Sequence, residues 1–422
     1  MDHNPNDPIT QIQSKVVTAI QYPPYATAAE NDGAYARYVS ADHPRMLPPN
    51  LNIKLGRREG NRVEDAYTGR WYWDCWRQGS KFNLGHRPPK LVQAWKESID
   101  YVDGGSWAQL SGYRARLAEM LAATTGGLLT GAVYGCSGSD GTEIALHTAR
   151  KITGRDKFVA IASVGYHGAT DLGLSVSGFS GSKQAQYRVD TSNTSFVPWG
   201  DLDAMVAAIN DQTAAVIMEP SPAQAGFPNP PEGYFAGIRE ACDRHGALLV
   251  IDEVQTGLGS PGGGHFWGFQ AIGVEPDIMF TGKGLGGGLY GISVAMMRDD
   301  IHLQLCEGLM IPHEGTYAGT DLGCIIAAAV IEMTNDLLPQ IKANSQRYFE
   351  AFAEAGIAAQ GFGSTMGLLV ENPIQAFSEL VDAGVLVIPS IVEPAIPFRP
   401  TLTQTPDEVE QVIAIVTGVL KR

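Results

Sequence analysis

The sequence predicts an α/β protein in which helices flank a mostly parallel central sheet and a smaller α+β domain lies beside it. Two observations predict the sheet. Short, continuous apolar runs are typical of strands buried on both faces, and helical segments separate them along the chain. The runs are FVAIAS (158–163), AAVIMEP (214–220), ALLVIDEV (247–254), DIMFTGK (277–283) and GISVAMM (291–297). Such sheets bind ligands at the carboxyl ends of their strands.

The other elements follow from periodicity and from helix start and stop signals. Residues 52–75 alternate and are rich in aromatic side chains, which predicts short strands with a turn at Thr68-Gly69. A further strand is expected at AVYGC (132–136). Helices are predicted over 89–101, 112–125, 141–154 (ended by Gly154), 235–246, 322–338 (continuing toward Gly356) and 406–420.

The domain division follows from these elements. Residues 1–60 are rich in Pro, Asn and Asp and show little regular period, and we predict that they contribute to the small domain. The large domain is expected over 61–321 and the C-terminal part of the small domain over 322–422.

Charge and composition exclude several classes of function. The 422 residues carry a formal net charge of −15, which argues against binding to nucleic acid or anionic membranes. The five cysteines include no CxxC pair, so we expect buried reduced thiols and no metal site. No apolar stretch approaches the roughly 18 residues of a membrane span, and residues 1–13 lack a signal-peptide core. We therefore expect a soluble, cytoplasmic protein.

The segment GCSGSDGTE (135–143) follows a strand and opens a helix. Ser139 and Asp140 are suitable N-cap residues, and Glu143 lies three residues after Asp140, as a capping box requires. Free amides at a helix start suit a phosphate, and Gly138 permits close backbone approach. A small-residue turn of this kind is also compatible with a purely structural role.

Two further side chains follow strands at the expected ligand edge. Tyr166, in VGYHGAT (164–170), could stack on a flat cofactor ring or simply pack in the core. Asp252, in VIDEVQTGLG (250–259), ends an apolar strand, where its carboxylate is costly unless it is compensated. A protonated pyridine nitrogen would compensate it, and so would the amides of a following helix.

Lys283 follows another apolar strand and precedes a glycine-rich segment, in DIMFTGKGLGGG (277–288). A partly desolvated lysine has enough neutral amine for Schiff-base chemistry, and the glycines leave room for a cofactor. Lysines after strands are also common on protein surfaces. The order of Asp252 and Lys283 along the chain is what strengthens the functional interpretation.

Taken together and in order, these segments resemble the class III (omega-type) aminotransferases, which have pyridoxal 5'-phosphate (PLP) fold type I. The resemblance covers roughly Asp65 to Gly323. It is carried by EDAYTGRWYWDCW…NLGH, GCSGSDGTEIALHTARKITGR, GYHGAT, AAVIMEP, GALLVIDEVQTGLG, VEPDIMFTGKGLGGG and EGTYAGTDLGC.

The resemblance implies a role for each matching residue. Lys283 would form the Schiff base with PLP and move a proton, Asp252 would pair with the ring nitrogen, and Glu219 would lie on the substrate side. Gly138 and Ser139 would bind the phosphate of PLP. Tyr166, Val254 and Gln255 would contact its ring. Thr316 would reach the phosphate bound in the partner subunit. The last contact requires a homodimer with shared active sites.

The chain departs from the family pattern in the substrate half of the site. EPSPAQAGF (219–227) stands where the family often has EPVQGEGG, and SPGGGHFWGF (260–269) where it often has GRTGxxFAF. Many family members have an arginine for the substrate carboxylate at the first position of the segment RFxPPL. In this chain the matching segment is PFRPTL (397–402), so that position is Pro397, and Arg399 lies two residues later. Trp76, Arg77 and Arg399 are the candidates for substrate contact.

Two functions use the implied chemistry. An aminotransferase would move an amino group between an amino acid or amine and a 2-oxo acid. The alternative is an isomerase on the same scaffold, either an amino-acid racemase or epimerase or an aminomutase. A catalytically inactive binding protein would not need Lys283, Asp252 and Gln255, and a dinucleotide dehydrogenase would need a GxGxxG motif after its first strand.

Overall fold

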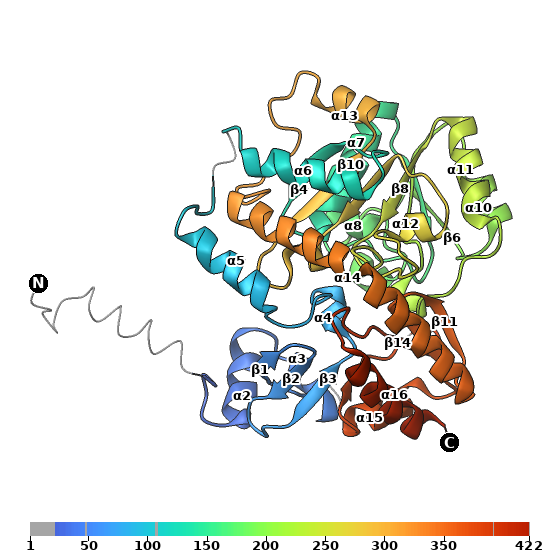
Figure 1. Cartoon of the computed structure of the whole chain (residues 1–422). Coiled ribbons are helices and arrows are strands. Elements are labelled where there is room, and N and C mark those ends of the chain that lie inside the picture. The colour runs from blue at the N-terminus through green and yellow to red at the C-terminus, as the bar shows by residue number, and fades with distance from the viewer. Residues whose placement is uncertain (1–21, 47–48, 106–108, 391, 422) are drawn as a thin grey trace, which may run out of the picture.

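The computed structural model describes residues 22–46, 49–105, 109–390 and 392–421. Its large domain contains a seven-stranded sheet, and the two ends of the described chain meet in a smaller part below it (Figure 1). In spatial order the strands are β4 (Gly131–Gly135), β10 (Ser293–Met297), β9 (Ile278–Thr281), β8 (Leu248–Asp252), β7 (Thr213–Met218), β5 (Lys157–Ile161) and β6 (Thr194–Val197).

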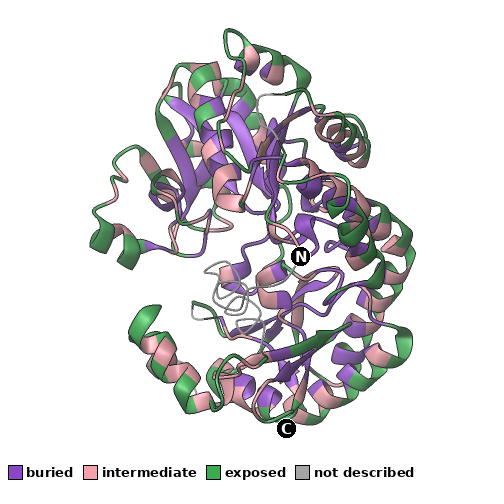
Figure 2. Ribbon diagram, turned by 90° about the vertical axis from the view of Figure 1, so that its left-hand side faces the viewer, coloured by how far each residue is buried: buried purple, intermediate pink, exposed green. Residues whose placement is uncertain are grey.

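Only β10 runs antiparallel to its neighbours, β4 and β9, within this sheet. The strands from β9 to β6 pair in parallel. The prediction of a mostly parallel sheet is therefore confirmed. The central strands are buried along their whole length, as their continuous apolar sequences require (Figure 2).

Helices cover both faces of the sheet because alternate strand residues point to opposite sides. On one face, Ala215 and Ile217 pack with α7 (Gly138–Thr153) and α13 (Asp299–Cys306). On the other, Val216 and Met218 share a core with the remaining covering helices. These are α6 (Gly112–Thr124), α10 (Leu202–Ala208), α11 (Tyr234–His245) and α14 (Asp321–Glu354).

Helix α14 is the single long helix predicted near 322–356 and contains Pro339. It begins at the large domain, against α5 (Pro89–Ile99) and α6, and ends against α16 (Pro406–Leu420) in the smaller part (Figure 1). In contrast to the expectation from sequence, α14 is long and apolar enough to cross a membrane by length and composition alone. In this fold, 44% of its most apolar 18-residue window is buried.

The smaller part combines segments that are far apart in the sequence. One sheet joins β1 (Leu55–Glu59), β2 (Arg62–Asp65), β3 (Trp71–Asp74) and β13 (Val385–Leu386), and another joins β11 (Ala359–Phe362), β12 (Thr365–Leu369) and β14 (Ala395–Phe398). Their common core includes Val63, Tyr72 and Trp73 from the N-terminal side and Phe377 and Phe398 from the C-terminal side. The boundary predicted at residue 61 falls between β1 and β2, which are neighbours in one sheet.

The N-terminal segment has more structure than its composition predicts. Helix α2 (Ala28–Tyr38) begins at a capping box, in which the Thr27 hydroxyl accepts from the Glu30 amide and Glu30 accepts from the Thr27 amide.

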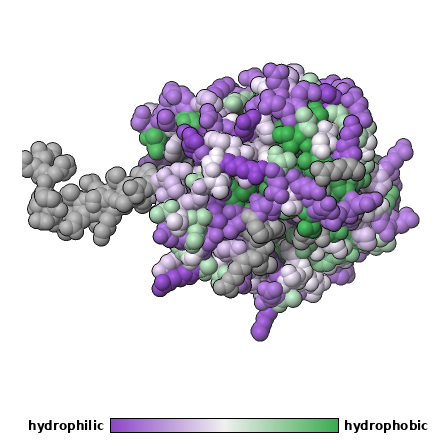
Figure 3. Space-filling model, turned by 90° about the horizontal axis from the view of Figure 1, so that it is seen from below, coloured by the Kyte–Doolittle hydropathy of each residue, from purple (hydrophilic) through white to green (hydrophobic). Residues whose placement is uncertain are grey.

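Seen from below, the surface carries both hydrophilic and hydrophobic residues, and the hydrophobic ones form the smaller groups (Figure 3). The remaining short elements are α3 (His43–Met46), η1 (Pro49–Leu51), α4 (Arg77–Ser80), α8 (Asp171–Ser175), α9 (Gly181–Tyr187), η2 (Ala223–Ala225), α12 (Gly268–Ala271), η3 (Lys283–Gly286) and α15 (Pro373–Asp382).

Candidate active site

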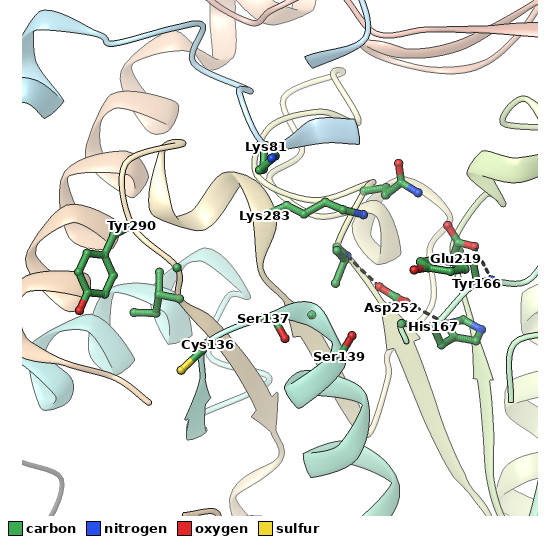
Figure 4. A pocket seen from close by; sticks show the side chains of 16 residues that line it. Lys81, Cys136, Ser137, Ser139, Tyr166, His167, Glu219, Asp252, Lys283 and Tyr290 are labelled. Atoms are coloured by element: carbon green, nitrogen blue, oxygen red, sulfur yellow. Dashed lines mark hydrogen bonds and ion pairs between the residues drawn. The ribbon is translucent and has the colours of Figure 1, made fainter. Parts of the chain in front are cut away.

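A cavity of about 310 Å³ opens at the carboxyl ends of β8 and β9, where a parallel sheet is expected to bind its ligand. The predicted motifs meet there (Figure 4). The lining includes Gly138, Ser139, Tyr166, Glu219, Asp252, Val254, Gln255 and Lys283 from the predicted site, together with Lys81, Cys136, Ser137, His167, Gly168, Tyr290, Gly291 and Ile292.

The N-terminus of α7 forms one end of the cavity. Its N-cap is Ser137, whose hydroxyl accepts from the Asp140 amide at 3.4 Å. The predicted N-cap at Ser139 or Asp140, with Glu143 completing the box, is therefore wrong by two or three residues. The Asp140 carboxylate accepts from the amides of Cys136 and Ser137, at 2.6 and 3.1 Å, and this starts the helix early. As first-turn residues, Gly138 and Ser139 have no intrahelical carbonyl partner for their amides.

Asp252 ends β8 and is buried, with 4% of its surface exposed. One carboxylate oxygen contacts His167 Nδ1 at 2.9 Å, and the other accepts from the Val254 amide at 3.0 Å. His167 is also buried, and its Nε2 has no hydrogen-bond partner among the described residues. Sequence reasoning missed His167, although it directly follows Tyr166 in the same motif. The contact fixes the direction in which the Asp252 carboxylate faces the cavity.

Lys283 begins η3 and is separated from β9 by Gly282. Its backbone has a positive φ of 39°, which is uncommon for a residue with a side chain. Loss of hydration lowers the pKa of its amine to about 8, although the charges of Asp252 and Glu219 oppose that change. The side chain extends across the cavity toward Tyr166 and Asp252 (Figure 4). A substantial fraction of the amine is therefore neutral near pH 8 and able to act as a nucleophile.

Glu219 follows β7 and is buried, with its carboxyl group close to the backbone of two loops. It accepts from the amides of Tyr166 and Ala223, both at 3.4 Å. Burial, and secondarily the charge of Asp252, raise its pKa to about 8. Burial and the nearby charge of Asp252 thus both favour the protonated form of the Glu219 carboxyl group.

Arg399 lies behind the cavity wall and does not line it. It is 4% exposed, and its Nη1 donates to Gln255 Oε1 at 2.5 Å. Because an arginine only donates, this contact turns the amide nitrogen of Gln255 away from Arg399. Burial lowers the Arg399 pKa to about 10. In this structure Arg399 orients a cavity residue and is not itself exposed to a ligand.

Arg77 is fully buried and also lies away from the cavity. Its Nε donates to Pro400 O at 2.8 Å and its Nη2 to Ser364 O at 3.1 Å. Its Nη1 donates to Asn83 Oδ1 at 3.1 Å and to Ser260 Oγ at 3.0 Å. All three guanidinium nitrogens therefore donate hydrogen bonds to protein acceptors.

Trp76 and Thr316 also lie outside the cavity wall. Trp76 is partly buried and packs against the core of the smaller part. Thr316 is exposed, on the loop that joins α13 to α14. The contact predicted for it is to another subunit, and it stays a prediction.

These residues fit a flat, phosphorylated pyridine. An amine, a buried carboxylate and the open amides of a helix start share one narrow cavity. The glycines keep it open: a Cβ on Gly138 would come within 2.8 Å of Val254 Cγ2, and one on Gly168 within 2.5 Å of Ser139 Oγ. The fold and this cavity define a PLP-dependent enzyme of fold type I.

Comparisons with known proteins give the family. The model of the family "Aminotransferase class-III" matches residues 46–420, and the chain belongs to that family. An uncharacterized aminotransferase of Archaeoglobus fulgidus is 39% identical over 310 residues, which are 73% of this chain and 71% of the relative. The acetylornithine aminotransferase of Methanosarcina acetivorans is 30% identical over 401 residues, 93% and 95% of the two chains.

A solved structure agrees with the fold. The ornithine aminotransferase of Toxoplasma gondii superimposes with a TM-score of 0.85 at 21% identity, covering 98% of each chain. The protein is thus a PLP-dependent aminotransferase, and it moves an amino group between an amino donor and a 2-oxo acid. The family match favours transfer over the isomerase alternative.

Proposed function

We propose that Lys283 is the residue that binds PLP covalently and then carries the proton during transfer. The observation behind this proposal is that its amine, with a pKa lowered to about 8, shares one cavity with the Asp252 carboxylate. When bound, PLP withdraws electrons from the carbon that bears the amino group, so that carbon loses a proton more easily. Lys283 is the amine in this cavity that approaches Tyr166 and Asp252 (Figure 4), and it can accept that proton when neutral.

The other cavity residues hold and orient the cofactor. Asp252, fixed by His167, would keep the ring nitrogen protonated by ion pairing. Tyr166 would cover one ring face and Val254 the other, and Gln255 would donate its amide N–H to the phenolic oxygen. The amides of Gly138 and Ser139 would bind the phosphate at the N-terminus of α7.

Glu219 differs from Asp252, because burial and the charge of Asp252 raise its pKa and favour its protonated form. A neutral carboxyl group donates a hydrogen bond as well as accepting one. We propose that Glu219 lies on the substrate side of the cofactor and contacts the reacting amino compound. In its protonated form Glu219 would not repel a substrate carboxylate.

The protein is proposed to act as a cytoplasmic homodimer with shared active sites. Thr316 is exposed beside a group of solvent-facing apolar side chains, which include Leu110, Met310 and Tyr317. Leu110 and Met310 line one surface hollow together with Gly315. A partner subunit that covered these side chains would remove apolar area from water and bring Thr316 to its neighbour's phosphate.

The function is tested with a panel of donors and acceptors. Ornithine and N-acetylornithine, suggested by the names of relatives, are incubated with the PLP-loaded enzyme together with simple amines, with and without pyruvate or 2-oxoglutarate. Chiral chromatography identifies the products. Amino product that forms only with an oxo acid supports transfer, whereas inversion or an amino shift without an oxo acid contradicts it.

A further inference from the structure

The segment Arg77–Ser80 has an uncommon backbone. Its four residues, Arg77, Gln78, Gly79 and Ser80, have φ values of 52°, 49°, 75° and 72°. Three of them carry side chains, which disfavour this left-handed region by about 1–2 kcal/mol each. Strain of this kind persists only where the surroundings fix it, and it is commonly found beside ligands.

Buried hydrogen bonds fix the first residue of this segment, Arg77. The Asp74 carboxylate accepts from the Arg77 amide at 2.7 Å and is held on its other oxygen by His86 at 2.8 Å. The Arg77 guanidinium binds the segment to Pro400 and Ser364, as described above. The segment also lies directly against η3: a Cβ on Gly284, the residue after Lys283, would come within 3.2 Å of Ser80 O.

This backbone carries Lys81 to the cavity. Lys81 follows Ser80, is exposed and lines the cavity near Lys283 (Figure 4). No carboxylate lies within 4 Å of its ammonium in the described part of the chain, although the ring of Phe82 is 5.7 Å away. Its charge contributes to lowering the Lys283 pKa. An unpaired cation in the wall of a cavity attracts an anion.

We propose that Lys81 binds a carboxylate of the substrate, so that the enzyme takes amino acids and 2-oxo acids in preference to amines without a carboxylate. The proposal rests on the proposed function, because it places the substrate in the same cavity. Two other cations near this wall are less available. Arg77 is committed to protein acceptors and Arg399 lies behind Gln255.

The test measures binding and not turnover. Glutarate, a dicarboxylate without an amine or ketone to react, is titrated into PLP-loaded enzyme by calorimetry, beside neutral glutaramide. We expect Lys81→Met to weaken glutarate binding roughly tenfold, the scale of one charge-assisted hydrogen bond, and to change glutaramide binding little. Lys81→Arg should restore most of the affinity. The matched control is Lys342→Met, because Lys342 is an exposed lysine on α14 that does not line the cavity.

Three results would overturn the proposal: no measurable glutarate binding to the wild type, equal affinities in wild type and Lys81→Met, or equal weakening for glutarate and glutaramide. The last would indicate a structural role, which the thermal unfolding midpoint of the variant also reports. The same preparations are reduced with borohydride and mapped. Loss of PLP from Lys283 in that assay contradicts the proposed function itself, whereas PLP retained on Lys283 confines the failure to Lys81.

Discussion

The two walls of the cavity are built differently. On the sheet wall, Asp252 and Lys283 stand at the ends of buried parallel strands, and Gly138 begins a 16-residue helix. On the adjoining wall, Lys81 follows a left-handed segment that a buried Arg77 connects to distant backbone. The first wall has the rigidity of regular elements, and the second depends on individual side-chain contacts.

This difference separates chemistry from specificity. Cofactor chemistry needs groups held within a fraction of an ångström, which strands and helices provide. Substrate choice is commonly carried by loops on such a scaffold. Changes in the sheet wall should therefore remove catalysis while leaving the fold intact, and changes behind the loop wall should affect stability or substrate preference.

The largest effect is expected for Lys283→Ala. Among the described lining residues the other primary amine is Lys81, whose proposed partner is the substrate carboxylate, so turnover should fall by at least about a thousandfold without the Lys283 amine. Lys283→Arg should fail equally, because it keeps the charge but has no primary amine. Steady-state rates measure the loss, and wild-type turnover in either variant would show that the assignment is wrong.

Asp252→Asn should lower kcat by roughly a hundredfold or more, since a neutral amide cannot hold the ring-nitrogen proton. The fold should survive, as judged by circular dichroism. The control is Asp201→Asn at the N-cap of α10, where asparagine caps as well as aspartate. More than half of the wild-type activity in Asp252→Asn would refute this role.

Substitution of Arg77, behind the loop wall, should lower the free energy of unfolding. Arg77→Met removes a buried guanidinium and leaves Pro400 O and Ser364 O without this donor, which should cost about 2–5 kcal/mol of unfolding free energy. Urea unfolding measures it, with Arg116→Met on the exposed side of α6 as a control within about 0.5 kcal/mol. Equal stability of the two variants would contradict the anchoring role.

The amine of Lys283 should also define a pH dependence. Because its pKa is lowered to about 8, the neutral form declines below pH 8, and capture of free PLP by the apoprotein should slow about tenfold per pH unit there. Above pH 8 the rate should level off. Stopped-flow absorbance follows the reaction, and a rate that keeps rising to pH 10 would indicate an ordinary exposed lysine.

The smallest effect is expected for Thr316→Ala. If Thr316 serves the neighbouring subunit's phosphate, PLP affinity should weaken by roughly tenfold, with little change in folding. Thr320→Ala is the control, because it should lower stability and leave PLP affinity nearly unchanged. Thr320 is the N-cap of α14, so its loss should cost about 1 kcal/mol of stability instead. A PLP-loaded monomer in ultracentrifugation would contradict the shared site.

The sheet wall could be predicted from the sequence because strand runs, caps and glycines are local signals. Helix α16 begins and ends at the residues expected for it, Pro406 and Leu420. The N-cap at Ser137 was misplaced because Asp140 and Glu143 both satisfy the spacing of a capping box. Helix α2 was missed because its apolar period is weak, although Thr27 and Glu30 carried its cap signal.

The loop wall could not be predicted in the same way. Arg77 contacts residues more than 280 positions away, and such pairings leave no local pattern. For that reason the sequence favours Arg77 as a substrate residue, whereas in the structure its guanidinium donates to backbone carbonyls and to the side chains of Asn83 and Ser260. Lys81 and His167 were missed since each is one polar residue beside a stronger motif. Their significance depends on which neighbours the fold brings to them.

Reduction with sodium borohydride followed by peptide mapping shows whether Lys283 holds the cofactor. Reduction makes the link between PLP and its lysine permanent, and mass spectrometry of a digest locates it. We expect one PLP per chain on the peptide that contains Lys283, and none in Lys283→Ala. PLP on the peptide that contains Lys81, or on no peptide, would contradict it.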